Sequence, residues 1–242
     1  MFNAKYSAQV SLRRHLHNEN IMVVPCLFTM LSERSMTEIS NLYKHILGTV
    51  SREIFAKMQE DEIKNFFTDE GIAVGVWHDN KLISIRTVKT GKCWVDKSIS
   101  ELGYFPTREK NMAFTGFCIV DPEFRGNNLQ FLTQYYAESI LTKTHDTIVT
   151  TVSPHNMYSL TNVIASGYNI VGIKDAYGGY LRYVLEKEFS PNYAIRTDKN
   201  VSIGYKDLKG QKKAIEAGMI GYKITIHPRS SSVLFAETEE CI

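Results

Sequence analysis

One segment of the chain, FCIVDPEFRGNNLQFL at residues 117–132, restricts its fold more than any other. An apolar run stops at an Asp-Pro pair, a polar Arg-Gly-Asn-Asn tetrapeptide follows at 125–128, and helical spacing begins at Leu129. Proline has no N–H for a β-ladder, so a strand ends there. The segment therefore predicts a strand that turns directly into a helix.

The turn between strand and helix has the composition of an anion site. A helix that begins near Asn127 leaves backbone N–H groups without intrahelical partners, at the positive end of its dipole, where anions bind. Gly126 allows close approach of a ligand, and Arg125 can pair with a phosphate oxygen. Asn127 and Asn128 tolerate left-handed backbone and can cap the helix. Taken alone, the loop fits an ordinary strand-to-helix turn equally well.

The first half of the chain has helical and strand patterns. A short strand is predicted at 22–28, and helical spacing recurs at 54–67. Ser35 and Glu38 have the spacing of a capping box, and apolar residues follow on one helical face. These are Ile39, Leu42, Tyr43, Ile46 and Leu47. Two β-type runs, 72–77 and 82–88, flank a turn at Asp79-Asn80 and predict a hairpin.

The second half continues this alternation. Residues 112–120 read as a central strand, and Leu129, Leu132, Tyr136 and Ile140 as the apolar face of the next helix. A strand is predicted at 146–153 and a helix between Pro154-Asn156 and Gly167. The remaining predicted elements are a strand pair at 168–189 hinged at Gly178-Gly179, a helix at 207–218 and a hairpin at 219–237.

The segment between these halves, residues 90–111, is polar and reads as a loop. At roughly twenty residues it is longer than most structureless connections. Long loops of this kind often cover or line a binding site. We therefore expect a lid or a substrate wall there.

Composition excludes several classes of function. Apolar residues at 43% and charged residues at 22% are typical of a folded soluble chain. Lys and Arg number 28 against 26 Asp and Glu, with the signs interspersed, so neither a nucleic-acid partner nor steering toward a highly charged substrate is expected. The longest apolar run is too short to span a bilayer, so no membrane partner is expected.

The cysteines and the N-terminus bear on location. The four cysteines, Cys26, Cys93, Cys118 and Cys241, lack metal-ligand or redox spacing, which indicates a reducing compartment and no metal site. The N-terminal residues have no continuous apolar segment typical of a signal peptide, so a cytoplasmic location is expected. The basic stretch SLRRHLH at 11–17 reads as a frayed or partner-dependent arm rather than a transit-type segment.

Two segments together resemble a known family. VDPEFRGNNLQ (120–130) and, about thirty residues on, SPHNMYSLTNVIASGY (153–168) resemble the two cofactor-binding signatures of the GNAT superfamily of acyl-coenzyme A dependent N-acyltransferases. The family signature is Gln or Arg, two variable residues, Gly, one variable residue, then Gly or Ala. Here Asn128 replaces the usual Gly, and Gln130 replaces a small residue where added bulk can crowd the pyrophosphate.

The resemblance covers about residues 22–189 and implies a fold and a domain order. The fold is α/β (α+β), with a mixed, largely antiparallel central sheet flanked by helices. The predicted domains are an N-terminal extension at 1–21, an acetyltransferase domain at 22–189 and an appended helix and hairpin at 190–242. The C-terminal hairpin can add strands to the main sheet or mediate a homodimer.

The resemblance also implies the cofactor-binding residues. The backbone of strand 118–120 would pair with the pantetheine arm as an added strand does, and the loop 125–130 would hold the pyrophosphate. Asn156 would face the pantetheine or the thioester, although Asn156 is otherwise a helix cap and Ser159 a first-turn residue. The predicted cofactor-binding residues are Cys118, Ile119, Val120, Arg125, Gly126, Asn127, Asn128, Leu129, Gln130, Asn156 and Ser159.

Acylation of an amine by a thioester needs an oxyanion site, a base and an acid. The family places unpaired backbone amides on the central strand, here at 117–120. Its usual Tyr acid corresponds to Val163, so Tyr158 is the nearest candidate catalytic residue, with a half-buried filler or surface role as the alternative. The candidate bases are Glu101, Glu123 and His155, each of which also reads as a solvated charge.

The resemblance thus implies an N-acetyltransferase that moves an acetyl group from acetyl-CoA to a primary amine of a small molecule by direct attack in a ternary complex. Its partners would be acetyl-CoA and the amine acceptor, without a metal. The altered loop and the missing Tyr leave one alternative open. In that alternative the fold binds acyl-CoA as a sensor and does not turn it over.

Overall fold

The computed structural model describes residues 8–16, 21–51, 53–55, 60–68, 70–104, 110–227 and 230–241. Contacts divide the chain into two units. Unit 1 contains residues 1–95 and 113–143, and unit 2 contains residues 96–112 and 144–242. The predicted division into domains at 1–21, 22–189 and 190–242 differs from these units and stays a prediction.

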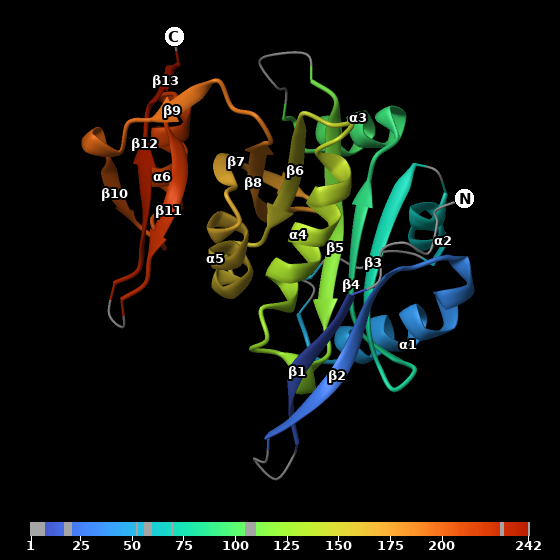
Figure 1. Ribbon diagram of the computed structural model, residues 1–242. Helices are drawn as coiled ribbons and strands as arrows, with labels where there is room; N and C mark the ends of the chain where they lie inside the picture. The colour runs from blue at the N-terminus through green and yellow to red at the C-terminus, as the bar shows by residue number, and fades with distance from the viewer. Residues whose placement is uncertain are drawn as a thin grey trace. The chain divides into compact units, whose positions relative to one another are not determined.

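Unit 1 is built on an antiparallel sheet (Figure 1). Its strand order is β1-β2-β3-β4-β5. The strands are β1 (Ala8–His15), β2 (Ile21–Met30), β3 (Gly71–His78), β4 (Lys81–Lys89) and β5 (Met112–Val120). The predicted hairpin is confirmed, since β3 pairs with β4 across a turn in which Asp79 and Asn80 have φ of 45° and 61°. Two successive left-handed residues match the twist of a tight hairpin.

The helices of unit 1 follow most of the predicted pattern. They are η1 (Glu33–Ser35), α1 (Met36–Leu47), α2 (Glu60–Lys64), η2 (Asn65–Phe67), η3 (Pro122–Phe124) and α4 (Leu129–Leu141). The predicted apolar face of α1 is buried except at Leu47, which is half-buried. The capping box is wrong, because Ser35 already ends η1 with φ −89° and ψ 8°, and its side chain makes no capping bond to the described first turn of α1.

Within the helical patch predicted at 54–67, residues 56–59 lie outside the described part of the chain. The described part holds α2 and η2, and its Ile63 and Phe66 are buried.

Helices α1 and α4 cover opposite faces of β4 (Figure 1). Ile85 belongs to the same apolar core as the buried side of α1, whereas the next residue, Arg86, binds α4. Adjacent strand residues point to opposite faces, which explains the alternation.

The buried side of α4 differs from the predicted one. Buried positions recur every four residues, and Leu132, Tyr136 and Ile140 are only half-buried. The buried residues are Leu129, Thr133, Gln134, Ala137, Glu138 and Leu141. The prediction was wrong because three polar residues of this face are buried by contacts from within the helix and from β4.

Two further predictions are corrected in this part of the chain. The N-terminal arm is not frayed over its described residues, because β1 pairs with β2 from Ala8 to His15 and buries Leu12. The polar loop at 90–111 instead contains α3 (Lys92–Glu101), which buries Val95 and Ile99 one helical turn apart. Residues 105–109 of that predicted loop lie outside the described part.

Unit 2 carries a second antiparallel arrangement of strands, in the order β6-β8-β7-β11-β12-β10, and a small sheet of β13 and β9. The strands are β6 (Thr147–Val152), β7 (Asn169–Ala176), β8 (Tyr180–Glu188), β9 (Tyr193–Ile195), β10 (Val201–Gly204), β11 (Ile220–Thr225), β12 (Ser232–Ala236) and β13 (Thr238–Glu240). The helices are α5 (Met157–Ala165), η4 (Thr197–Lys199) and α6 (Leu208–Glu216). The strand and helix predictions from residue 146 onward are confirmed.

The C-terminal hairpin adds strands to the sheet of unit 2. Gly221 of β11 pairs with Ile170 of β7, and β12 then pairs with β11. The hydroxyl of Tyr183 on β8 donates to Gln211 Oε1 of α6 over 2.7 Å, and both residues are fully buried. The first of the two alternatives for the hairpin is therefore confirmed, while the homodimer stays a prediction.

Candidate functional site

The loop between β5 and α4 begins at a buried carboxylate. Asp121 is 1% exposed, its Oδ1 accepts from the Glu123 N–H at 3.0 Å, and its Oδ2 lies 2.7 Å from Lys81 Nζ. These bonds hold the first residues after β5 in the short helix η3. The Asp-Pro pair thus ends the strand, as the sequence predicts, and directs the chain toward α4.

The backbone of the loop is left-handed at two positions. Gly126 has φ 81°, and Asn128 has φ 55° and ψ 26°. The prediction that Asn128 tolerates left-handed backbone is confirmed. Its expected capping role is wrong, because the Asn128 side chain makes no capping bond to the described start of α4. In α-helices generally, the backbone N–H groups of the first turn have no partner within the helix, which makes a helix start a place where anions bind.

Asn127 is committed to the protein rather than to a ligand. Its Oδ1 accepts from the Arg13 N–H at 2.9 Å, and its Nδ2 donates to Arg13 O at 2.6 Å and to Phe124 O at 2.9 Å. The amide therefore joins the loop to strand β1. Any contact of Asn127 with a cofactor is left to its backbone.

A buried cation that the sequence analysis did not select lies under the first turn of α4. Arg86 on β4 is 2% exposed, its Nη2 donates to Gln130 O at 2.7 Å, and its Nε donates to Thr133 Oγ1 at 3.2 Å. Both contacts are to neutral oxygens, so they leave the positive charge in place. Because the charge adds to the positive end of the α4 dipole, the site favours an anion. Arg86 was detectable as the one charged residue inside an apolar strand run.

The strand predicted to meet the pantetheine arm is β5. Its residues Cys118, Ile119 and Val120 lie opposite Arg86, Ile85 and Ser84 of β4. Among the described strands of unit 1, β5 follows β4 at the end of the strand order. These three residues remain predicted cofactor contacts.

The prediction that the Phe117 amide is an unpaired oxyanion donor is wrong. Its N–H donates to Thr87 Oγ1 at 2.9 Å, at a place where the register between β4 and β5 shifts. A donor that is already used inside the sheet is not available to a tetrahedral intermediate. The amides of residues 118–120 therefore remain as the predicted oxyanion donors.

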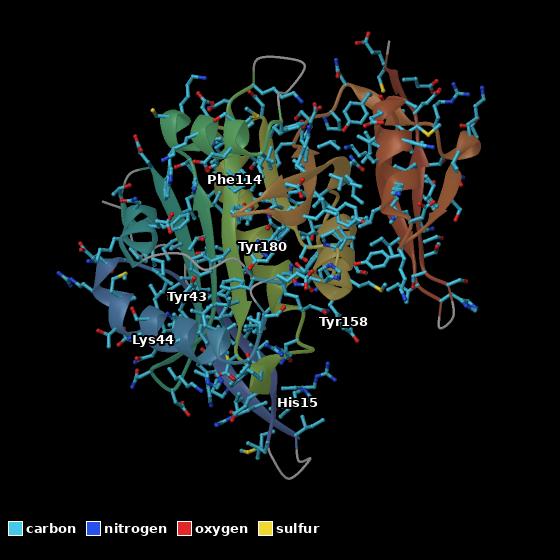
Figure 2. All side chains as sticks on the ribbon, turned by 180° about the vertical axis from the view of Figure 1, so that it is seen from behind. His15, Tyr43, Lys44, Phe114, Tyr158 and Tyr180 are labelled. Carbon is cyan, nitrogen blue, oxygen red and sulfur yellow. The ribbon has the colours of Figure 1, made fainter. Side chains whose placement is uncertain are left out.

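The other predicted cofactor and catalytic residues lie in unit 2, at the start of α5. Asn156 is the N-cap, and its Oδ1 accepts from the Ser159 N–H at 3.1 Å. The capping alternative for Asn156 is thus confirmed, and its Nδ2 donors are the atoms left for a ligand carbonyl. Tyr158 is 88% exposed on the outside of α5 (Figure 2). Tyr158 is therefore not a core filler. Val163, which stands at the position of the family Tyr, is buried.

The candidate bases have different surroundings. Glu123 in unit 1 forms an ion pair with Arg14 Nε at 2.8 Å. Glu101 and His155 in unit 2 are exposed. The pair with Arg14 makes Glu123 the least suitable of the three as a base, since its carboxylate is already bound to a cation.

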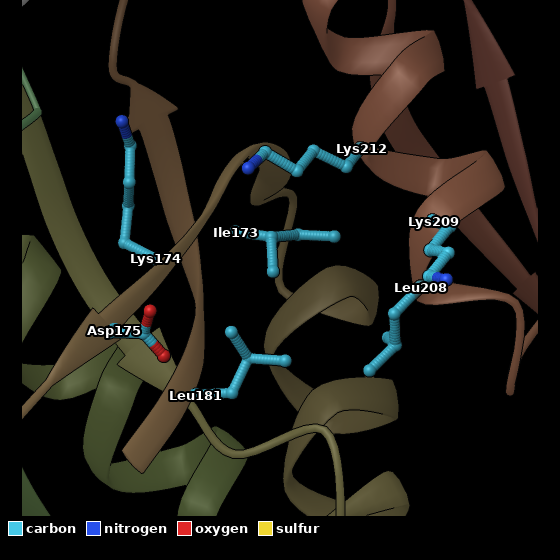
Figure 3. Close-up of a pocket in the computed structure, with 7 residues that line it drawn as sticks. All are labelled: Ile173, Lys174, Asp175, Leu181, Leu208, Lys209 and Lys212. Carbon is cyan, nitrogen blue, oxygen red and sulfur yellow. The ribbon is translucent and has the colours of Figure 1, made fainter. Parts of the chain in front are cut away.

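Unit 2 also contains an open cavity of about 260 Å³ between the β7–β8 hairpin and α6. Figure 3 shows Ile173 and Leu181 of the hairpin facing Leu208 of α6. Lys174, Asp175, Lys209 and Lys212 complete its lining. None of the predicted cofactor or catalytic residues lines this cavity.

Among the described residues, no three His, Cys, Asp or Glu side chains gather in a way that could hold a metal ion. No helix among them combines the length and the apolar character needed to cross a membrane.

The protein belongs to the mixed α/β class. It has antiparallel sheets, helices that cover them and a left-handed turn that leads from β5 into α4. Comparisons with protein-family models and with curated protein sequences find no match. Solved structures do match. An N-acetyltransferase from Staphylococcus aureus Mu50 has a TM-score of 0.51 at 13% identity, over 67% of this chain and 97% of that one.

Two other structures match equally well. A GNAT-family acetyltransferase from Streptococcus pneumoniae has a TM-score of 0.51 at 14% identity, over 68% of this chain and 99% of that one. Arabidopsis thaliana NAA60 in complex with acetyl-CoA has a TM-score of 0.51 at 11% identity, over 68% of this chain and 98% of that one. The chain has the fold of the GNAT N-acetyltransferases, and the predicted fold class is confirmed.

Proposed function

We propose that this protein is a GNAT-type N-acetyltransferase that moves an acetyl group from acetyl-CoA to a primary amine of a small-molecule acceptor. The loop from β5 into α4 carries the proposal. Left-handed backbone at Gly126 and Asn128 precedes a helix start whose first turn is not capped by the Asn128 side chain, and Arg86 lies beneath it. Together with the shared fold, this loop supports a pyrophosphate-binding role.

The proposed reaction is direct attack of the amine on the thioester in a ternary complex. The attacking nitrogen forms a bond to the acetyl carbon, the carbon–sulfur bond breaks, and the departing thiolate takes up a proton. The amides of 118–120 would stabilise the oxyanion. The Asn156 side chain would bind a carbonyl of the pantetheine arm. The Tyr158 hydroxyl would supply the proton.

Calorimetric titration with acetyl-CoA tests the cofactor site. Wild type is expected to bind in the micromolar range, and Arg125→Ala and Asn156→Asp are expected to bind more weakly. Asp keeps the cap on α5 and removes the amide donors, so it separates ligand contact from helix stability. Wild-type protein without measurable binding would overturn the proposal. The position of Gln130 in the altered signature would then be the first place to examine.

The role of Tyr158 has its own test. Tyr158→Phe is expected to lower turnover at saturating acetyl-CoA and amine about 10²-fold, the lower end of general acid catalysis, and to leave acetyl-CoA affinity unchanged. Because Tyr158 is 88% exposed, the melting temperature is expected to stay constant. Tyr135→Phe, another exposed tyrosine, is the control. Unchanged turnover in Tyr158→Phe would remove this residue from the mechanism.

A sensor that binds acyl-CoA without turnover is the second candidate function. The absence of the family Tyr at Val163 favours it. Release of free thiol in the presence of a panel of primary amines separates the two functions. An enzyme releases coenzyme A with at least one amine, whereas a sensor binds acetyl-CoA and releases none.

A further inference from the structure

Strand β1 lies against the loop that was predicted to hold the pyrophosphate (Figure 1). The amide of Asn127 makes a two-way bond with the backbone of Arg13, at 2.9 Å and 2.6 Å. One residue on, Arg14 pairs with Glu123 at 2.8 Å. The N-terminal strand is thus part of the structure that positions this loop, although over a hundred residues separate them in sequence.

Two basic side chains of β1 reach the loop at Gly126. Arg13 Nη2 donates to Gly126 O at 3.0 Å, and a β-carbon added to Gly126 would lie 3.9 Å from His15 Nε2. Arg13 and His15 are two residues apart on a strand, so they share one face, and both are exposed. His15 is labelled in Figure 2. The buried Leu12 and half-buried Arg14 are on the other face.

The two arginines of β1 differ in the charge of their partners. Arg14 has a carboxylate partner in Glu123, whereas the contact of Arg13 with the loop is to a neutral carbonyl. That bond uses one of the five N–H donors of a guanidinium, which is a planar fork suited to phosphate oxygens. Arg13 therefore adds positive charge beside the left-handed turn, and Arg13 and His15 both place side-chain nitrogen atoms there.

We propose that Arg13 and His15 bind the phosphate groups of coenzyme A, so that strand β1 completes the phosphate end of the cofactor site. This inference rests on the proposed function. It assigns to the N-terminal strand a binding role that the loop 125–130 was expected to have alone. Two sources of phosphate oxygen exist in the ligand, the pyrophosphate and the 3′-phosphate, and both have the chemistry that a guanidinium recognises.

The test is calorimetry of wild type and Arg13→Gln with three ligands. Acetyl-CoA has all the phosphates, acetyl-3′-dephospho-CoA lacks the 3′-phosphate, and acetyl-pantetheine has no phosphate. Losing one charge-assisted contact is expected to weaken acetyl-CoA binding roughly tenfold. Acetyl-pantetheine binding is expected to be unchanged. Arg13→Lys is expected to retain part of the affinity, since it keeps the charge.

Controls separate binding from folding. The bond between Asn127 and Arg13 uses only the Arg13 backbone, so Arg13→Gln keeps it. Arg34→Gln, an exposed arginine of η1, is the matched control and is expected to bind all three ligands as wild type does. His15→Gln is expected to have a smaller effect in the same direction as Arg13→Gln.

The outcomes distinguish the 3′-phosphate from the pyrophosphate, and a binding role of Arg13 from a structural one. If the loss in Arg13→Gln disappears with the dephospho ligand, Arg13 binds the 3′-phosphate; if it persists, Arg13 binds the pyrophosphate. Equal weakening of acetyl-pantetheine would indicate a structural role and overturn the inference. Wild-type affinity in Arg13→Gln would also overturn it and leave the proposed function intact. Absence of acetyl-CoA binding to wild type would overturn both.

Discussion

Asn128 is the residue at which the loop departs most clearly from the family signature, and its backbone explains why the departure is tolerated. At φ 55° the residue occupies the left-handed region, which asparagine adopts more readily than other non-glycine residues. Glycine, the residue of the family signature at this position, adopts this backbone conformation without strain. The substitution therefore preserves the turn while adding a side chain next to the predicted phosphate site.

Two changes at Asn128 are expected to have different effects. Asn128→Ala is expected to lower the free energy of unfolding by about 1 kcal/mol, because a β-carbon without a compensating polar group is strained in this region. Asn128→Gly is expected to leave stability nearly unchanged and to bind acetyl-CoA at least as well as wild type. Urea unfolding and calorimetry measure the two quantities. Equal stability of the alanine and wild-type proteins would mean that the turn relaxes.

Site residues were predictable where their roles are local. The left-handed Asn128 and the cap Asn156 follow from residues within a few positions of each other. Arg86 and Arg13 were not predictable in the same way, because their contacts with the loop are 44 and 113 residues away in sequence. An isolated sequence shows that a charged residue is present but does not show which backbone turn it meets.

Elements show the same dependence on context. The β3–β4 hairpin was predictable from Asp79-Asn80, since a tight turn is determined by its own residues. Strand β1 and helix α3 were missed because charged and polar residues interrupt the apolar ones in both segments. Strand β1 is stabilised by pairing with β2, and helix α3 by burial of Val95 and Ile99.

Close packing around Gly116 of β5 predicts that a larger residue there lowers the stability of the protein. A β-carbon there would lie 2.5 Å from the Phe66 ring and 2.5 Å from Thr87 Oγ1. Gly116→Ala is expected to destabilise the protein by about 1–3 kcal/mol, the usual range for overpacking. Gly48→Ala is the control, because its nearest atom would be 3.6 Å away. Equal urea midpoints for the two variants would contradict this prediction.

A polar cluster of Tyr104, Lys110 and two glutamates of β8 predicts how the free energy of unfolding responds to alkaline pH. The Tyr104 hydroxyl donates to Glu186, and Lys110 Nζ contacts Glu186 at 2.8 Å and Glu188 at 2.7 Å. Burial, and then the charge of Glu186, raise the pKa of Tyr104 above its ordinary value of 10.0. Below that pH the hydroxyl is protonated in both folded and unfolded chains. Above it, only the unfolded chain readily releases the proton, so stability falls as pH rises.

Tyr104→Phe removes this proton and is expected to make the loss of stability above about pH 10 less steep. The free energy of unfolding in urea, measured for both proteins at several pH values on each side of that point, gives the slopes. Tyr135→Phe is the control, because Tyr135 is 69% exposed. Identical slopes for Tyr104→Phe and wild type would show that Tyr104 titrates as it does in the unfolded chain.

At the scale of the whole molecule, the likeness to the three solved acetyltransferase structures covers about two thirds of the chain, 67–68%. The C-terminal residues from 190 onward were predicted to be an appended element, yet their strands continue the sheet of unit 2 through β11 and β7. An appended element that extends a sheet is not energetically separate from it. The buried Tyr183 and Ile170 lie next to that addition.

Removal of residues 190–242 therefore tests whether the predicted domain at 22–189 is self-sufficient. The truncation removes Gln211, which accepts from the buried Tyr183 hydroxyl, and leaves the β7 edge without β11. A buried hydroxyl without its partner and an uncovered edge strand both favour aggregation or unfolding. We expect the truncated chain to be insoluble or to melt well below wild type. Gln211→Glu in the full chain keeps an acceptor for Tyr183 and is expected to lose less stability. A soluble truncated chain with the wild-type melting temperature would instead establish 190–242 as a separate appended domain.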